Sequence, residues 1–263
     1  MFYADYHAHS DCLEGRVEKM QEYVQRAHER GIRRIGFSEH YWNGKFPGWG
    51  RWYKPRMTED LYKIREDAAE LSLPEGMSVR IGCETEFSQE NVIPLTKEDL
   101  AALDYIVVPH SHINMTGVVT DRIFKGDPAG AAQFMINSFW ALMAHPLAEQ
   151  IDILAHPFAP VGMDEEQDEV LSYISDEEFR RCARAARDLG IVLEINSLTW
   201  RDKTMEQVEK SGFIRLFGIA KEEGCRFTYG SDAHRAEQYD LMPFAQRIAV
   251  LAGITREDMH NIP

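Results

Sequence analysis

The chain has 263 residues, of which 44% are hydrophobic, so it is long enough to bury the core of one α/β barrel. Its formal net charge is -14, which argues against nucleic acid or an anionic membrane as a general partner. The first residues lack the basic and apolar regions of a signal peptide, and no apolar run approaches the roughly 18–20 residues of a membrane span. We therefore expect a cytoplasmic protein.

Strand and helix patterns alternate along the chain. In the first half of the chain, short apolar runs and helical periodicity predict strands at 2–7, 32–38, 77–87 and 105–108 and helices at 17–30, 58–71, 96–103 and 130–144. In the second half they predict strands at 152–155, 191–196 and 226–231, helices at 175–189 and 241–251, and a mostly helical stretch at 205–223. Thr58 is the expected N-cap of its helix, and Ser175 with Glu178 forms a capping box.

Seven short apolar strands that alternate with helices are typical of a parallel sheet covered on both faces. This pattern predicts a parallel α/β barrel. Because no linker or internal repeat interrupts it, we expect residues 1–263 to form a single domain. Residues 42–55, rich in tryptophan, are long for a plain connection and form either a substrate lid or a well-packed surface loop.

Histidines and carboxylates recur where the predicted strands end. The segments are Asp5–His9, Ser38–His40, Gly82–Glu86, Ala155–Pro157 and Ser231–His234. In a parallel barrel all of these ends meet on one face, where sites are built. Imidazole and carboxylate are ligands that zinc, manganese and iron accept, so we expect a cluster of metal ions there. His7 and His9 point the same way from an extended strand, and Asp5 on that face is a candidate to orient an imidazole or to be an alternative ligand.

These motifs resemble the PHP (polymerase and histidinol phosphatase) superfamily over nearly the whole chain, from Asp5 to His234. The resemblance implies a distorted (β/α)7 barrel that binds up to three divalent ions. It implies one ion on His7, His9, Glu84 and Asp232. It implies a second ion on Glu84 as a bridge, on His156 and on a histidine at the end of the 105–112 segment, and a third on His40, His234 and one ligand after the first motif.

Two places depart from the pattern of the histidinol phosphatases in that family. The segment after His9 has no histidine and resembles instead the version with an acidic residue and glycine found in other PHP phosphoesterases, which implies Glu14 as the third-site ligand, with Asp11 as the alternative. In the second place the chain offers two histidines, His110 and His112, where the family has one. The pairing with Ser111 favours His112, and His110 is the alternative ligand or a residue that supports one.

The stretch 193–201 resembles the part of histidinol phosphatases in which an arginine binds phosphate, and Arg201 matches that arginine. A guanidinium group can fork onto phosphate oxygens, although Arg201 could instead be a surface residue paired with Asp202. The resemblance implies a metal-dependent phosphomonoesterase with a small phosphate ester, foremost L-histidinol phosphate, as substrate. Glu39, Glu86 and His110 are the candidates for protonating the leaving group.

Three alternatives remain open: a PHP phosphoesterase for a nucleotide or sugar phosphate, a non-catalytic metal-holding scaffold, and a metal-dependent amidohydrolase. The last usually needs a carboxylated lysine, and no predicted strand end presents a suitable one. The expected cofactors are two or three divalent ions of zinc, manganese or iron. The expected partner is the small-molecule ester alone, without nucleic acid or membrane, and the oligomeric state is left open.

Overall fold

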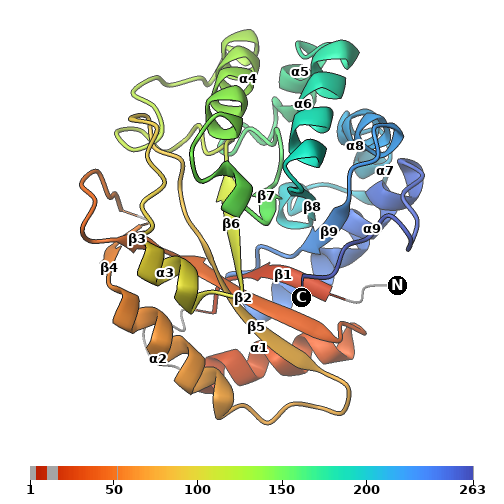
Figure 1. Cartoon of the computed structure of the whole chain (residues 1–263). Helices are drawn as coiled ribbons and strands as arrows, with labels where there is room; N and C mark the ends of the chain where they lie inside the picture. Colours follow the sequence, from red (N-terminus) through yellow and green to blue (C-terminus); the bar gives the residue numbers. More distant parts are fainter. Residues whose placement is uncertain (1–3, 11–16, 52, 263) are drawn as a thin grey trace.

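The computed structural model describes residues 4–10, 17–51 and 53–262. Its main sheet consists of parallel strands in the order β1 (Ala4–Ala8), β2 (Arg34–His40), β5 (Ser78–Glu84), β6 (Tyr105–Pro109), β7 (Ile153–Ala155), β8 (Val192–Asn196) and β9 (Phe227–Gly230). The sheet curves until its two edges meet, and Figure 1 shows the helices around its outside. The predicted distorted (β/α)7 barrel is thereby confirmed.

In the described residues, backbone hydrogen bonds close the barrel at the carboxyl ends of β1 and β9. The amide of His9 donates to the carbonyl of Ala233 at 2.8 Å, and the amide of Asp232 donates to the carbonyl of His7 at 2.6 Å. These bonds join the end of β1 to the segment that follows β9. The pairing of β1 with β2 also shifts register between Asp5 and Ala8, which adds to the distortion. Closure therefore falls on the residues that carry the first and last histidine motifs.

The helices connect the strands on the outside. They are α1 (Val17–Glu29), α2 (Thr58–Ala69), α3 (Lys97–Ala102), α4 (Pro128–Met143), α5 (Gln167–Ser172), α6 (Asp176–Asp188), α7 (Met205–Val208), α8 (Phe213–Glu222) and α9 (Met242–Leu251), with the 3₁₀ turns η2 (Ala148–Gln150), η3 (Leu198–Trp200) and η4 (Ala236–Leu241). A small parallel pair, β3 (Trp42–Asn43) and β4 (Pro55–Arg56), borders the segment after β2. No helix in the described ranges is both long and apolar enough to cross a bilayer.

One helix prediction is refined by the structure and another was wrong in detail. The stretch 205–223 is mostly helical, as expected, and is interrupted between α7 and α8, where Asp168 accepts hydrogen bonds from the Gly212 amide at 2.8 Å and the Ser211 hydroxyl at 3.2 Å. Met57, rather than Thr58, is the N-cap of α2. The Thr58 hydroxyl instead donates to Asp99 at 2.7 Å. At both places a carboxylate from elsewhere in the chain accepts the hydrogen bonds: Asp168 at the break between α7 and α8, and Asp99 from the hydroxyl that was expected to cap α2.

Only half of the predicted capping box forms. The Ser175 hydroxyl accepts from the Glu178 amide at 3.2 Å, as expected for an N-cap. The Glu178 carboxylate accepts from the indole of Trp140 at 2.7 Å instead of returning to the Ser175 amide. Tertiary packing of α6 against α4 thus replaces one local bond with a bond between helices.

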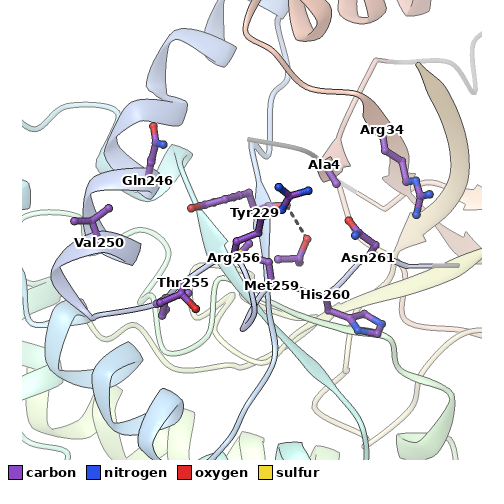
Figure 2. A pocket seen from close by; sticks show the side chains of 12 residues that line it. Ala4, Arg34, Tyr229, Gln246, Val250, Thr255, Arg256, Met259, His260 and Asn261 are labelled. Atoms are coloured by element: carbon purple, nitrogen blue, oxygen red, sulfur yellow. Dashed lines mark hydrogen bonds between the residues drawn. The ribbon is translucent and has the colours of Figure 1, made fainter. Parts of the chain in front are cut away.

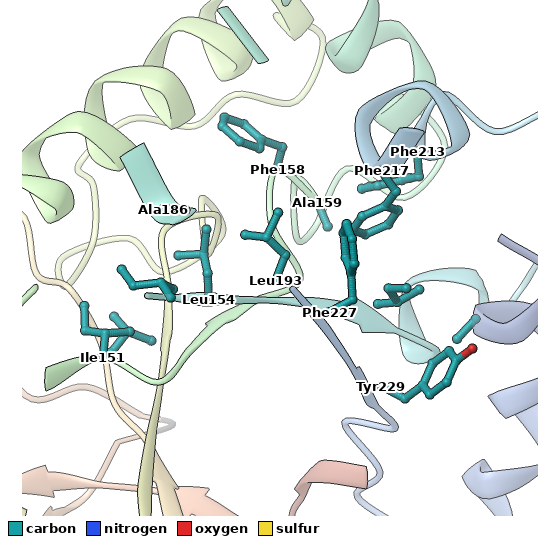
Figure 3. Packing of buried hydrophobic residues seen from close by; sticks show 14 of the residues in the cluster. Ile151, Leu154, Phe158, Ala159, Ala186, Leu193, Phe213, Phe217, Phe227 and Tyr229 are labelled. Atoms are coloured by element: carbon teal, nitrogen blue, oxygen red, sulfur yellow. The ribbon is translucent and has the colours of Figure 1, made fainter. Parts of the chain in front are cut away.

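The apolar core has two layers, because side chains alternate between the two faces of each strand. Val107, Ile153 and Ala155 point into the barrel, whereas Leu154 and Leu193 belong to the layer under the helices. Figure 3 shows part of the outer layer, with Leu154 and Leu193 directed toward the helices and Phe227 toward Phe217.

Inside the barrel, the ring of Tyr105 lies over the backbones of β2 and β5. A side chain at Gly36 or Gly82 would overlap this ring, so these two strands need glycine at the point of closest approach. The Tyr105 ring also meets that of Tyr6 edge-on at 5.5 Å between centroids. The barrel is therefore a filled core, and the polar cluster described below lies at one end of it.

Candidate metal centre

Histidines and acids from six strands meet at the carboxyl end of the barrel. Parallel strands all run in one direction, so the ends of distant sequence segments converge there. Three groups of residues each bring a ligand atom within 4.8 Å of the others: His7 with His9 and Asp232, Glu84 with His112 and His156, and His9 with His40 and His234. The structure thus brings together eight of the residues that the sequence singled out.

Glu84 is at the centre of these groups and is 1% exposed. Its Oε1 atom lies 3.5 Å from Nε2 of His7, 3.5 Å from Nε2 of His156 and 3.8 Å from Nε2 of His112. One carboxylate oxygen therefore faces three imidazole nitrogens from three strand ends. This is the arrangement expected of a bridging ligand.

The second oxygen of Glu84 faces the remaining histidines. Its Oε2 atom lies 2.9 Å from Nδ1 of His40 and 3.7 Å from Nε2 of His9. His40 and His234 approach each other through their Nε2 atoms at 3.4 Å, and the ring of His9 stacks against both. Burial and the neighbouring rings of His40 and His234 hold the pKa of His9 well below its usual value, so its neutral imidazole is available to a cation.

Several ligand atoms are buried without a hydrogen-bond partner among the described residues: Nε2 of His7, both ring nitrogens of His9, Oε1 of Glu84 and Nε2 of His156. Buried polar atoms in native proteins nearly always have partners, and each one left without a partner costs about 1–3 kcal/mol. Here the atoms without partners converge on one another. Divalent ions would satisfy them together, so the residues present fit the metal ions that the sequence motifs imply.

The carboxylates of the cluster are anionic at neutral pH. Burial alone would raise the pKa of Glu84 and of Asp232, but the adjacent His7 and other imidazoles outweigh it and hold both pKa values well below their usual range. Burial likewise lowers the pKa of His7, but Glu194, Asp232 and Glu84 outweigh it and raise that pKa well above its usual value. Buried negative charge of this kind requires cations beside it.

Glu194 holds two of the histidines in place. Its Oε1 atom lies 2.6 Å from Nδ1 of His7, and its Oε2 atom accepts from the backbone amide of His156 at 2.6 Å. A side chain at Gly230 would overlap the Glu194 carboxylate, so the neighbouring strand needs glycine there. A carboxylate on the far nitrogen of a ligating imidazole fixes its tautomer and increases its basicity.

Two further contacts orient the histidines of the second group. The Ser111 hydroxyl lies 3.0 Å from Nδ1 of His156, and Glu86 contacts Nδ1 of His112. In each case the other nitrogen, Nε2, is left facing Glu84. Glu86 therefore positions an imidazole, which is a different role from the proton donor considered from the sequence.

The backbone is strained at two members of the cluster. His156 has φ of 28° and Asp232 has φ of 52°, in a region that residues other than glycine rarely adopt. Such strain persists only where the surroundings hold it, and it is concentrated at functional sites. His156 directly follows β7 and Asp232 lies two residues after β9, and the side chains of both join the cluster.

Three sequence predictions are placed differently by the structure. Asp5 contacts backbone rather than an imidazole: it accepts from the His7 amide at 3.1 Å and from the Ser231 amide and hydroxyl at 2.8 and 2.7 Å. Asp5 thus ties β1 to the segment after β9. Glu39 accepts from the amide and hydroxyl of Ser10 at 2.6 and 3.1 Å, so it is also committed to a loop.

His110 lies away from the cluster. Its Nδ1 atom is 3.2 Å from the carbonyl of Met135, and its Nε2 atom accepts from the amide of Phe158 at 3.1 Å. Burial lowers the pKa of His110 to about 3, so the ring is a neutral bridge between two backbone groups. The geometry therefore favours His112 over His110 as the ligand candidate. The predicted third-site ligands, Glu14 and Asp11, lie outside the described residues.

A cavity of about 410 Å³ opens over the cluster. Its lining includes His40, Glu84, His112, Asp232 and His234 together with Tyr53, Arg201 and Arg235. Tyr53 and Arg235 were not among the site residues expected from the sequence. Arg235 directly follows the last histidine motif, which is a signal that could have identified it. Tyr53 has no such signal, because it belongs to the irregular segment 42–55.

Segment 42–55 is anchored at both ends and exposed between them. Trp42 and Tyr53 are buried, and the Tyr53 ring meets that of His40 edge-on at 4.8 Å. Trp49 is 53% exposed. The segment therefore packs as a surface loop at its base, while its role as a substrate lid stays a prediction.

Arg201 is at the edge of this cavity and is half exposed. Its guanidinium group lies 3.0 Å from Asp164 and 3.3 Å from Asp202. Both roles considered from the sequence are thus compatible with its position, since it pairs with surface carboxylates and also lines the cavity.

Comparisons with known proteins agree with this architecture. A comparison with curated proteins gave no match to the sequence. Among solved structures, a histidinol phosphate phosphatase from Lactococcus lactis, complexed with zinc, L-histidinol and phosphate, is similar over 96% of this chain and 94% of its own, with a TM-score of 0.64 and 18% identity. An N-isopropylammelide isopropylaminohydrolase from Burkholderia multivorans is similar over 91% of this chain and 57% of its own, with a TM-score of 0.44 and 12% identity.

At 18% identity the likeness to the Lactococcus lactis enzyme concerns the fold alone, and nothing is inferred from the second likeness, whose TM-score is 0.44. The sequence itself decides the family: the profile of the PHP domain matches residues 5–198, which include the segments ending in His7, His40, Glu84 and His156. The chain therefore belongs to the PHP domain family.

Proposed function

We propose that this protein is a metal-dependent phosphomonoesterase that hydrolyses a small phosphate ester. One observation carries the proposal. Buried ligand atoms without partners converge around Glu84 beneath a cavity of about 410 Å³ that also has two arginines in its lining. A cluster suited to divalent cations beside guanidinium groups matches the chemistry of a phosphate dianion.

The proposed ligands form three sites. The first is His7, His9, Glu84 and Asp232, the second is Glu84, His112 and His156, and the third is His40 and His234 with Glu14 or Asp11. Zinc, manganese and iron all suit this donor set. When bound, such ions would supply Lewis-acid chemistry and activate water for attack on phosphorus.

Arg201 is proposed to bind the phosphate. Its present pairs with Asp164 and Asp202 are solvent-exposed, and such pairs contribute only about 0–1 kcal/mol. A phosphate dianion that accepts a forked pair of hydrogen bonds can therefore displace them. Tyr53 lines the same cavity, and its phenol is neutral, because burial and the carboxylates of Glu84 and Glu86 raise its pKa well above the usual value.

L-Histidinol phosphate is the proposed substrate. Support comes from the sequence stretch 193–201 and from the fold shared with the Lactococcus lactis enzyme. One observation favours the alternative, another small ester such as a nucleotide or sugar phosphate. Glu194 in that stretch is committed to His7 and His156, and Arg201 would bind phosphate in any ester.

The test is hydrolysis of a panel of small phosphate monoesters by the full chain, with metal content measured on the same sample. A kcat/KM for L-histidinol phosphate about tenfold above the rest of the panel supports the specific proposal. A different best ester would replace the substrate and leave the phosphomonoesterase in place. Two or three bound ions without hydrolysis of any ester would favour a non-catalytic scaffold, and fewer than one ion, unrestored by manganese or zinc, would contradict the metal centre itself.

A further inference from the structure

A second cavity, of about 400 Å³, lies at the opposite end of the barrel. Its lining comes from the first residues of β1 and β2, from β9, from α9 and from the tail that follows α9. Figure 2 shows Arg256 and Tyr229 in its middle, with Gln246 and Val250 of α9 on one side and Arg34 and Asn261 on the other. Because it is at the amino ends of the strands, it is separated from the candidate metal centre by the filled barrel core.

The charge of this cavity is opposite to that of the whole chain. The protein has 43 acidic residues and a net charge of -14, yet the described lining contains Arg34 and Arg256 and neither aspartate nor glutamate. The tail carries two acids, Glu257 and Asp258, outside this lining, and Asp258 accepts hydrogen bonds from the amide and hydroxyl of Thr255 at 2.7 and 2.9 Å. The arginines therefore face the cavity without an acid in its described lining.

The other polar groups of the lining are neutral. Burial raises the pKa of Tyr229 to about 12, so its phenol keeps its proton at neutral pH. Burial and Arg226 lower the pKa of His260, so its imidazole is uncharged there. Gln246 and Asn261 add amide groups. Phenol and amide N–H groups can all donate to an anion, and they carry no negative charge that would repel it.

The remaining lining is apolar, and hydrogen bonds to backbone carbonyl groups hold the surrounding segments in place. Val250, Ile254 and Met259 supply aliphatic surface. The tail is paired with β9, since the amide of His260 donates to the carbonyl of Phe227 at 2.7 Å. At the rim, Arg34 donates to the carbonyl of Ile262 at 2.6 Å. The cavity is thus a formed concave site with apolar walls and a few polar groups, as small-molecule sites usually are.

We propose that this cavity binds a small organic anion, with the anionic group at Arg256 and the carbon skeleton against Val250, Ile254 and Met259. The inference is independent of the proposed phosphatase activity, because it uses none of the residues of the metal centre.

Three probes of matched size and different charge test it: benzoate, benzyl alcohol and benzylammonium. Binding to the full chain is followed through the methyl resonance of Met259, which lines the cavity. Benzoate should bind roughly 10-fold or more tightly than the neutral alcohol, since a hydrogen bond to a charged group is about twice as strong as a neutral one, and benzylammonium should bind most weakly. Equal binding of the three probes, or no shift of Met259 with benzoate, would overturn the proposal.

Two substitutions locate the binding. Arg256→Leu should weaken benzoate roughly 10-fold, whereas Arg247→Leu, on α9 but paired with Glu209 outside the cavity, should not. Val250→Glu places a carboxylate at a side chain that is 58% exposed, so it should fold and also repel benzoate. Arg201→Ala should leave the Met259 response unchanged. If Arg256→Leu and Arg247→Leu behave alike, or if only Arg201→Ala abolishes binding, the anion site is not at this end of the barrel.

Discussion

The two ends of the barrel are built from the same strands but carry opposite chemistry. At the carboxyl end, Glu84 and Asp232 lie among six histidines, and Oε1 of Glu84 and several imidazole nitrogens have no hydrogen-bond partner among the described residues. At the amino end, Arg34 and Arg256 face a cavity whose described lining has no acid. The difference shows that the amino and carboxyl ends of the same strands can carry side chains of opposite charge. The two ends of each strand are far apart, so the residues at one end do not constrain those at the other.

This comparison is tested most strongly by removing the carboxylate at the centre of the metal end. Glu84→Gln keeps the shape of the side chain but removes the negative charge that faces five imidazoles, those of His7, His9, His40, His112 and His156. We expect the loss of at least one ion per chain and a fall in kcat of about 1,000-fold, since metal ions contribute several kcal/mol to such reactions. Elemental analysis and single-ester kinetics measure both.

The matched control for that change is Glu75→Gln. Glu75 is exposed in the turn before β5, at the amino end of the same strand that carries Glu84. The Glu75→Gln variant should have the same metal content and kcat as the unmodified protein. Equal losses of metal and of kcat in Glu84→Gln and Glu75→Gln would contradict a metal centre confined to the carboxyl end of the barrel.

The next largest effect is expected at the edge of the metal-end cavity. Arg201→Ala should raise KM for the ester and lower kcat/KM by roughly 10–1,000-fold, because a charged, forked hydrogen bond to phosphate is lost. Arg201→Lys should restore only part of it, since an ammonium group cannot reproduce the planar fork. Metal content should stay constant in both. Unchanged kinetics in Arg201→Ala would remove the reason for placing phosphate beside it.

A smaller effect on metal binding should follow when a residue that positions the histidines is changed and all of the histidines are kept. Glu194→Gln breaks the charged contact with Nδ1 of His7 and should weaken metal affinity by about 10–100-fold, the usual cost of losing such a supporting carboxylate. Titration with a metal-indicator dye measures the affinity. If the affinity is unchanged while the protein unfolds more easily, Glu194 has only a structural role.

The smallest expected effect is a pH dependence of metal binding. Burial lowers the pKa of His112, but Glu86 and Glu84 outweigh it and raise the pKa to about 9, so the metal-free ring is protonated at pH 7. A metal binds only the neutral imidazole, so binding must release this proton. Affinity should therefore rise by up to about tenfold per pH unit below pH 9 and level off above it.

Calorimetry in two buffers of different ionisation enthalpy measures the protons released on binding. His112→Gln should release one proton fewer than the unmodified chain. An equal release would show that His112 is neutral before the metal binds, or that it is no ligand.

Much of the site was predictable because strand direction is encoded locally. Short apolar runs ending in His7, His40, Glu84 and His156 are readable without the fold, and parallel order then places their ends together. Between His110 and His112, the sequence favoured His112 through its pairing with Ser111 and kept His110 as the alternative. Both follow the same strand, and only packing against Met135 and Phe158 commits the first to backbone bonds.

By itself the sequence determined the alternation of strands and helices, the barrel, the family and the residue types at the strand ends, since these depend on periodicity and on motifs within a few residues. The tertiary structure decided which partner each polar group takes. Asp5 binds the Ser231 backbone, and Glu194 holds His7 across 187 positions. Arg256 and Arg34 share a cavity although they are far apart along the chain. The physical reason is that a hydrogen bond or ion pair depends on distances of a few ångströms, and these are set only when the sheet closes.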